Sequence, residues 1–193
     1  MDQRYHIGIQ TERYEFFLKN GFVFNHETET SLGWIVSGSW HDQNAMYGMR
    51  SYKGNQKNLY SNLIFATKLS EHQKLSTGMS MNYDFFDEHL MYEEDLLSSM
   101  INKGEHYKTN ELVAGAFAEY SLHLHDKFIA LAGFRADYSD LYGLFFTPRL
   151  HLKYMPNDYL HLRTTLGKAY RSPRMLAENN NYLASNRRLI IQD

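Results

Sequence analysis

The sequence predicts an all-β protein, a segment of an antiparallel transmembrane β-barrel with about eight to ten long strands. Apolar and polar residues alternate along most of the chain, and the alternating runs are about 10 to 13 residues long. Short and long connections also alternate between the runs. Soluble strands have about 5 or 6 residues, whereas a strand tilted by about 45° needs roughly 9–11 to cross a bilayer. Strand length and connection lengths together indicate an outer-membrane barrel.

Eight runs alternate between two faces. Residues 74–83 show the pattern most clearly, with Met79 and Met81 on one face and Ser76 and Ser80 on the other. We predict strands at residues 12–24, 32–41, 58–69, 74–83, 111–123, 127–138, 144–155 and 159–170, with partial strands at 5–10 and 189–193.

The connections between these strands fall into two classes. The short ones are residues 25–30, 70–73, 125–126 and 156–158. The long ones are 42–57, 84–110 and 171–186, and 139–143 is a shorter member at the same end. Short turns at one end and long loops at the other are typical of outer-membrane barrels, so we expect short periplasmic turns and long extracellular loops.

Composition narrows the function classes. The 193 residues carry a formal net charge of −2, so no overall positive field favours nucleic acid. Cysteine is absent, which excludes disulfides, zinc–thiolate sites and thiol nucleophiles. No catalytic elbow or triad is recognisable, so we expect no enzyme and no cofactor.

The mean hydropathy of −0.54 would fit a soluble β-sandwich or lipocalin-like barrel. Strand length and the aromatic residues at strand ends favour the membrane barrel.

A basic strip marks the face that we expect to line the barrel lumen. Arginine or lysine facing lipid at mid-membrane costs about 2–4 kcal/mol, so these side chains should point inward. The strip consists of Arg149, His151, Lys153, His161 and Arg163.

The turn at residues 156–158 sets the expected pairing of this strip. It would place Lys153 opposite His161 and His151 opposite Arg163. Like charges at such short range need a wet or acidic surrounding, for which a hydrated or plugged lumen, or carboxylates such as Glu119 and Asp137, would serve.

The long loops hold the candidate ligand-binding residues. Loops on a rigid scaffold usually carry recognition, and those at 42–57 and 84–110, with their flanks, are rich in aromatic residues and histidine. The candidates are Trp40, Tyr47, Tyr52, Tyr92, His89 and His106. Interface anchoring or loop packing explains Trp40, Tyr47 and Tyr52 equally well, and a solvated outer-surface loop is the alternative for the residues in 84–110. His123 and His125 have no paired carboxylate nearby in sequence, so we expect no metal site.

The segment that gives the most specific indication of a protein family lies near the end of the chain. A strand ends at Gly167-Lys168-Ala169-Tyr170-Arg171, and Ser172 and Pro173 have the positions of a helix N-cap and first helical residue. A short helical turn would then run through Glu178. The segment resembles the G-x-x-Y-R-x-P stretch of TonB-dependent outer-membrane receptors, and its continuation is similar to the version in Bacteroidetes. The residues carrying the motif are Gly167, Tyr170, Arg171, Pro173 and Glu178.

This resemblance implies a transport function. Receptors of the family have a 22-stranded barrel around an N-terminal plug, so residues 1–193 would be an internal part of the barrel without the plug. The parent would import a scarce nutrient, such as a ferric siderophore, a cobalamin or another metal chelate, across the outer membrane of a Gram-negative bacterium.

The implied partners are the TonB complex, reached through an N-terminal region absent here, the nutrient chelate, outer-membrane lipid and a surface lipoprotein, with no nucleic acid. The alternative is a complete eight-stranded barrel with a structural or adhesion role. An open, curved sheet favours the receptor, and a closed one favours the small barrel.

Overall fold

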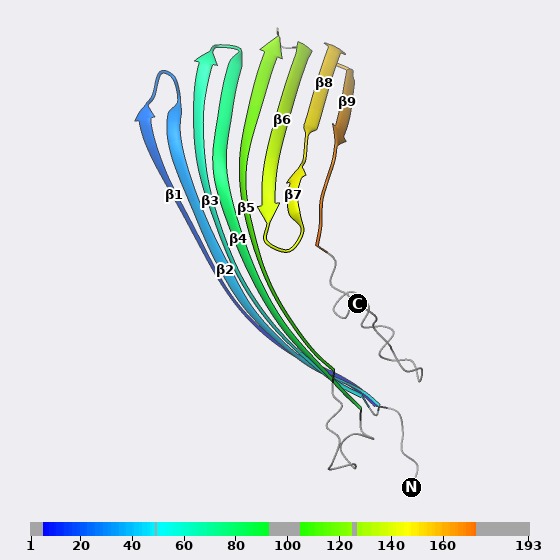
Figure 1. Cartoon of the computed structure of the whole chain (residues 1–193). Coiled ribbons are helices and arrows are strands. Elements are labelled where there is room, and N and C mark those ends of the chain that lie inside the picture. Colours follow the sequence, from blue (N-terminus) through cyan, green and yellow to red (C-terminus); the bar gives the residue numbers. More distant parts are fainter. Residues whose placement is uncertain (1–5, 49, 93–104, 125–126, 173–193) are drawn as a thin grey trace.

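The protein forms one antiparallel sheet (Figure 1). The computed structural model describes residues 6–48, 50–92, 105–124 and 127–172, and most of these residues lie in strands. The strands are β1 (Ile7–Asn25), β2 (Thr30–Tyr47), β3 (Arg50–Ser70), β4 (Gln73–Tyr92), β5 (Glu105–Leu124), β6 (Phe128–Ser139), β7 (Gly143–Phe146), β8 (Arg149–Asn157) and β9 (Leu160–Gly167). The predicted all-β class and antiparallel arrangement are confirmed.

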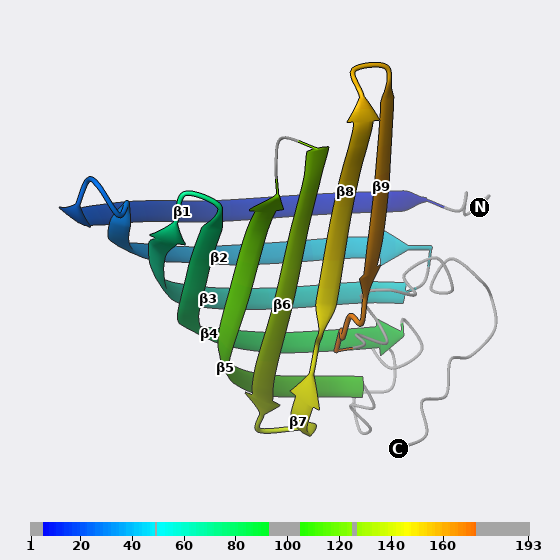
Figure 2. The ribbon, with the colours of Figure 1, turned by 90° about the horizontal axis from the view of Figure 1, so that it is seen from above.

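The sheet is open and curved (Figures 1 and 2). Its strand order is β1-β2-β3-β4-β5-β6-β8-β9, with the short β7 paired to β6. Within the described residues β1 and β9 do not pair, whereas a closed eight-stranded barrel would join them. The same residues include no helix long and apolar enough to cross a membrane.

The first five strands are longer than the alternation predicts. The predicted loops 42–57 and 84–110 are largely strand, because β2 runs to Tyr47, β3 starts at Arg50, β4 runs to Tyr92 and β5 starts at Glu105. The ladder stays in register through this part, for example where Asp42 pairs with Asn55. The outer face is largely polar there, with Asp42, Asn55 and Asp87, so the hydropathy pattern ends although the backbone hydrogen bonding continues.

The predicted strand 144–155 is divided into β7 and β8. Pro148 causes the break, because proline has no backbone N–H to donate to the ladder. The preceding Thr147 still donates its N–H to the carbonyl of Arg135 at 2.9 Å. The partial strand expected at residues 5–10 is instead the start of β1. The one expected at residues 189–193 lies outside the described residues.

The two faces of the sheet differ in polarity. Within β2 to β9, the large exposed apolar side chains share one face, called the outer face, which carries Trp34, Leu63 and Met79. The opposite, inner face carries buried polar side chains, including Glu111 and Asp137. An apolar exposed face with a polar buried one is the inverse of a soluble sheet, and it suits a strand wall between lipid and a lumen.

A row of aromatic and cationic side chains limits the apolar part of the outer face. The rings of Tyr14 and Trp40 lie 6.3 Å apart. The Lys57 amine lies 5.3 Å from the Trp40 ring and 5.7 Å from the Phe85 ring, and the Lys108 amine lies 5.2 Å from Phe85. We call these five residues the aromatic row. Amphipathic rings and long lysines are typical of a membrane interface, so the strands protrude beyond the apolar belt after this row.

Close strand packing at Gly78 gives a first prediction. A Cβ at this position of β4 would clash with the Leu63 carbonyl oxygen and would lie 2.5 Å from the Phe117 ring. Gly78→Ala should therefore lower the free energy of unfolding by about 1–3 kcal/mol, as overpacking usually does. Denaturant unfolding of the detergent-solubilised protein measures this loss. Gly21→Ala is the control, because nothing lies within 4 Å of its added Cβ. Equal effects of the two variants would show that packing at Gly78 is not limiting.

Candidate functional site on the inner face

The inner face contains a hollow of about 580 Å³. It lies over β5, β6 and the β7–β8 segment, and the chain that follows β9 closes one side. The side chains that line it combine charge with aromatic surface, and they include Phe117, Glu119, Arg135, Phe145, Arg149 and Tyr170. Such a mixture can hold a polar ligand or a protein segment by ion pairs, hydrogen bonds and ring contacts.

Two ion pairs form the charged part of the hollow. The Arg135 Nε donates to both carboxylate oxygens of Asp137, at 2.9 and 2.7 Å, and its Nη2 donates to the Ser80 hydroxyl at 2.6 Å. Arg149 pairs with Glu119 across β5, β6 and β8. Because both arginines are fixed by carboxylates, the wall presents oriented charge pairs, and Lys168 and Arg171 add two further cations to the lining.

The motif segment is held against this wall by a carboxylate and a ring. Glu111 of β5 accepts hydrogen bonds from the Ser139 hydroxyl at 2.9 Å and from the Ser172 hydroxyl at 2.8 Å. The Tyr170 ring stacks on Phe145, with centroids 3.9 Å apart and planes 20° apart. These contacts tie the chain after β9 to β5, β6 and β7, although it is distant from β5 in sequence.

Of the other four motif residues, the structure describes two. Gly167 ends β9, where it pairs with Arg149. Arg171 lines the hollow together with Tyr170. Pro173 and Glu178, and with them the predicted helical turn, lie outside the described residues.

The basic strip lies on the inner face, but its predicted pairing is wrong by two residues. Lys153 pairs with Arg163 and His151 with Thr165. Asp158 and Tyr159 form the turn, because the Asn157 side-chain oxygen accepts hydrogen bonds from the backbone N–H groups of residues 159 and 160 at 3.1 and 2.9 Å. A register irregularity between Tyr154 and Asn157 adds to the shift. A shift of two residues keeps each side chain on its face.

The six ligand-binding candidates do not form one site, because the two tyrosines at 47 and 52 pack together on one face and the two histidines stack on the other. They are also on strands or strand ends rather than in loops, because β2 to β5 extend through the predicted loops. By register, Tyr47 and Tyr52 lie on the inner face, and Trp40, His89 and His106 on the outer face. Tyr92 ends β4, where it pairs with Arg50, and its side chain is outside the described part.

The two inner-face tyrosines belong to a buried cluster beyond the hollow. Tyr47 and Tyr52 pack there with Ala45 and Leu90. The Tyr52 hydroxyl donates to the Glu88 carboxylate at 2.7 Å. Burial, followed by this contact with a carboxylate, raises the pKa of Tyr52 far above its ordinary value, so it remains a neutral donor.

Sequence reasoning named Glu119 and Asp137 as carboxylates for the lumen side but missed three other acidic side chains of the inner face. Asp84, Glu88 and Glu111 are all less than 10% exposed, and all three lie in or next to the segment predicted as a loop. Their signal was parity: Asp84 and Glu88 keep the same even numbering as the inner-face residue Ser80. Continuing the period of two through the polar part of β4 would have placed them inward.

Comparison with known proteins identifies the family. The family profile described as "TonB dependent receptor-like, beta-barrel" matches residues 2–189. The chain is 31% identical over 83 residues to a probable TonB-dependent siderophore receptor, PirA, of Acinetobacter baumannii. That alignment covers 43% of this chain and 11% of the relative.

Solved structures agree on the fold. The copper transporter OprC superposes with a TM-score of 0.65 at 15% identity, over 85% of this chain and 31% of that one. The alcaligin receptor FauA of Bordetella pertussis gives 0.60 at 14% identity, over 80% and 28%. The siderophore receptor PirA of Pseudomonas aeruginosa gives 0.55 at 12% identity, over 88% and 28%. The chain thus spans less than a third of each relative, and its sequence match, sheet and two-faced strands show that it belongs to the TonB-dependent receptor β-barrel family.

Proposed function

We propose that this chain is part of the barrel wall of an outer-membrane receptor that takes up a scarce nutrient by coupling to TonB. The observation that carries the proposal is the polarity of the sheet. Its exposed apolar face ends at the aromatic row, and its inner face holds the hollow with the Arg135–Asp137 and Arg149–Glu119 pairs. A lipid-facing wall with a polar lumen is what a transport barrel requires.

The inner wall supports a role in binding a plug or a passing ligand. Phe117 and Arg149 both line the hollow, so a ring and a cation fixed by Glu119 are available to one ligand. A metal chelate is the nutrient class that the relatives favour, because their names denote siderophore receptors and a copper transporter. A ferric siderophore, a cobalamin or another metal chelate would satisfy this class.

The open sheet favours this proposal over a small structural or adhesion barrel. Within the described residues the outward edges of β1 and β9 have no partner strand, and such an edge is unstable in a bilayer. Further strands from the same receptor would provide these partners. The receptor would lie in the outer membrane of a Gram-negative bacterium and would act with TonB as a transporter rather than an enzyme.

Uptake measurements test the function. We expect deletion of the gene to remove growth on one iron chelate, cobalamin or copper source under limitation, and a plasmid copy to restore it. Deletion of tonB should abolish uptake of the same radiolabelled compound, although the receptor remains at normal levels in the outer membrane. Uptake that continues without TonB, or growth unaffected on every metal chelate tested, would contradict the proposal.

A further inference from the structure

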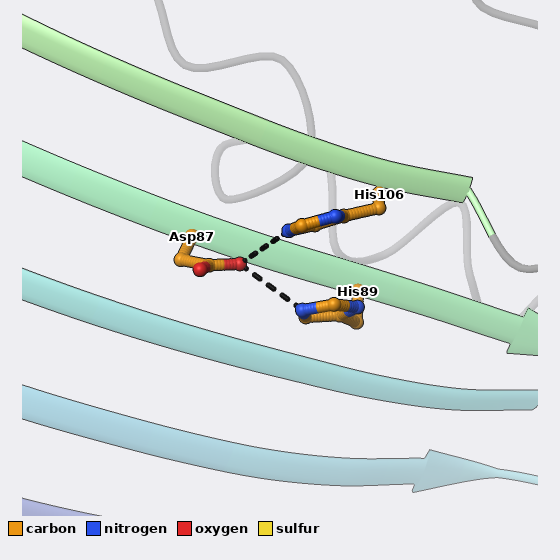
Figure 3. A group of neighbouring side chains, drawn as sticks. All are labelled: Asp87, His89 and His106. Carbon is orange, nitrogen blue, oxygen red and sulfur yellow. Dashed lines mark hydrogen bonds and ion pairs between the residues drawn. The ribbon is translucent and has the colours of Figure 1, made fainter.

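Three side chains with metal-ligating atoms converge on the outer face, away from the hollow (Figure 3). Asp87 Oδ1 lies 2.8 Å from the His106 Nε2 and 3.1 Å from the His89 Nε2. The two imidazole rings stack with centroids 3.9 Å apart and planes 13° apart. One carboxylate oxygen and two imidazole nitrogens therefore point at the same small volume.

Strand pairing explains why these residues meet. His89 of β4 and His106 of β5 are direct partners in the antiparallel ladder. Asp87 is two residues before His89 and so lies on the same face. Asp87 is level with Lys108 of the aromatic row, and His89 and His106 lie two residues farther along their strands, at the outer edge of the apolar belt. The site is fixed by two neighbouring strands rather than by a loop.

The distances suit a small late-transition-metal ion. A tetrahedral zinc ion binds nitrogen and oxygen ligands at about 2.0–2.2 Å, which places those ligands about 3.3–3.6 Å apart. The observed contacts are shorter by a few tenths of an ångström, so small side-chain rotations would admit an ion. Two imidazoles favour zinc, copper or nickel, whereas calcium and magnesium require mainly oxygen ligands.

Solvent access and neighbouring charges both affect metal binding by these three side chains. The side chains of His89 and His106 are 47% and 48% exposed, so an ion can reach them from solvent. Lys53 pairs with His89 and Lys108 with Asp87, and both cations weaken the attraction of a dication. The Lys108 amine lies over the Phe85 ring, 5.2 Å from its centre.

We propose that Asp87, His89 and His106 form a binding site for a divalent late-transition-metal ion, with a further coordination position open to water or another donor. The bound ion would join β4 to β5 where both strands protrude from the apolar belt. The site is independent of the proposed uptake function, because it lies on the opposite face from the hollow.

Zinc binding tests the site. We expect isothermal titration calorimetry of the protein purified from outer membranes to show Zn²⁺ binding. His89→Ala and His106→Ala should each weaken it by more than tenfold, because loss of an outer-shell partner alone costs roughly 10–100-fold. His72→Ala is the matched control, since this histidine lies in the exposed β3–β4 turn, and it should leave the dissociation constant unchanged.

Copper and thermal measurements separate a built site from a simple hydrogen-bonded triad. With Cu²⁺, electron paramagnetic resonance should show two imidazole nitrogens, and the double variant His89→Ala/His106→Ala should lose this signal. Added Zn²⁺ should raise the melting temperature of the wild type and not that of the double variant. Equal Zn²⁺ affinity in wild type and double variant, or an equal loss in the His72 control, would overturn the proposal.

Discussion

Replacing Met79 with arginine should lower the free energy of unfolding in lipid vesicles by about 2–4 kcal/mol. Met79 is 69% exposed on the outer face of β4, midway between Gln73, where the strand begins, and Phe85 of the aromatic row. Its ladder partners are Leu63 and Ala116, so no carboxylate faces it from either neighbouring strand. An arginine there would lie in hydrocarbon without a partner, and denaturant titration in vesicles measures that cost.

Two further variants on the same strand make this prediction specific to the face. Ser76→Arg places the cation on the inner face opposite Glu119, and we expect a cost below about 1 kcal/mol. Thr77→Arg lies at nearly the same membrane depth as Ser76→Arg but on the outer face. Its loss of unfolding free energy should exceed that of Ser76→Arg and stay below that of Met79→Arg, because the penalty for an arginine facing lipid depends on depth. Equal costs for all three would mean that the apolar face does not contact lipid.

The sequence predicted the strands where one face had to be apolar. Met79 and Met81 alternate with Ser76 and Ser80 because lipid and lumen impose opposite polarities on neighbouring residues. Beyond the aromatic row the outer face no longer has to be apolar. Polar residues such as Asp87 can therefore lie on the outer face there, as well as on the inner face. The ladder continues there through backbone hydrogen bonds that leave no trace in hydropathy.

Contacts between distant strands could be predicted only in kind: the sequence offered Glu119 as a carboxylate for the basic strip, but not Arg149 as its partner. The Arg149–Glu119 pair depends on the β5–β6 register and on β8 resuming the ladder after Pro148. His89 and His106 meet because β4 and β5 remain paired through a segment that reads as a loop. At the β8–β9 hairpin, one amide side chain, that of Asn157, decides the turn and so moves the register. The pairing of residues on different strands depends on turns, on breaks such as Pro148 and on how far each ladder continues. The hydropathy pattern does not contain this information.

On the inner face, Asp137→Ala should lower the free energy of unfolding about as much as Met79→Arg does on the outer face. Asp137 is 6% exposed and accepts two hydrogen bonds from the Arg135 Nε, at 2.7 and 2.9 Å. Asp137→Ala would leave the Arg135 guanidinium with the Ser80 hydroxyl in place of an opposite charge. Breaking a buried pair costs about 3–5 kcal/mol. Since the Arg135 side chain is 35% exposed, we expect about 2–3 kcal/mol, measured by denaturant unfolding in vesicles.

A double-mutant cycle distinguishes this charge effect from a loss of packing. If the stranded guanidinium causes the cost, Arg135→Ala should recover part of the stability lost in Asp137→Ala, with a coupling energy of about 1–2 kcal/mol. Glu15→Ala is the control, because its pair with Arg13 is more than half exposed on both sides and should be worth less than about 1 kcal/mol. Strictly additive effects at positions 135 and 137 would assign the cost to packing. Coupled effects would show that the inner wall is stabilised by charge pairs, so its polarity is part of the fold as well as a surface for ligands.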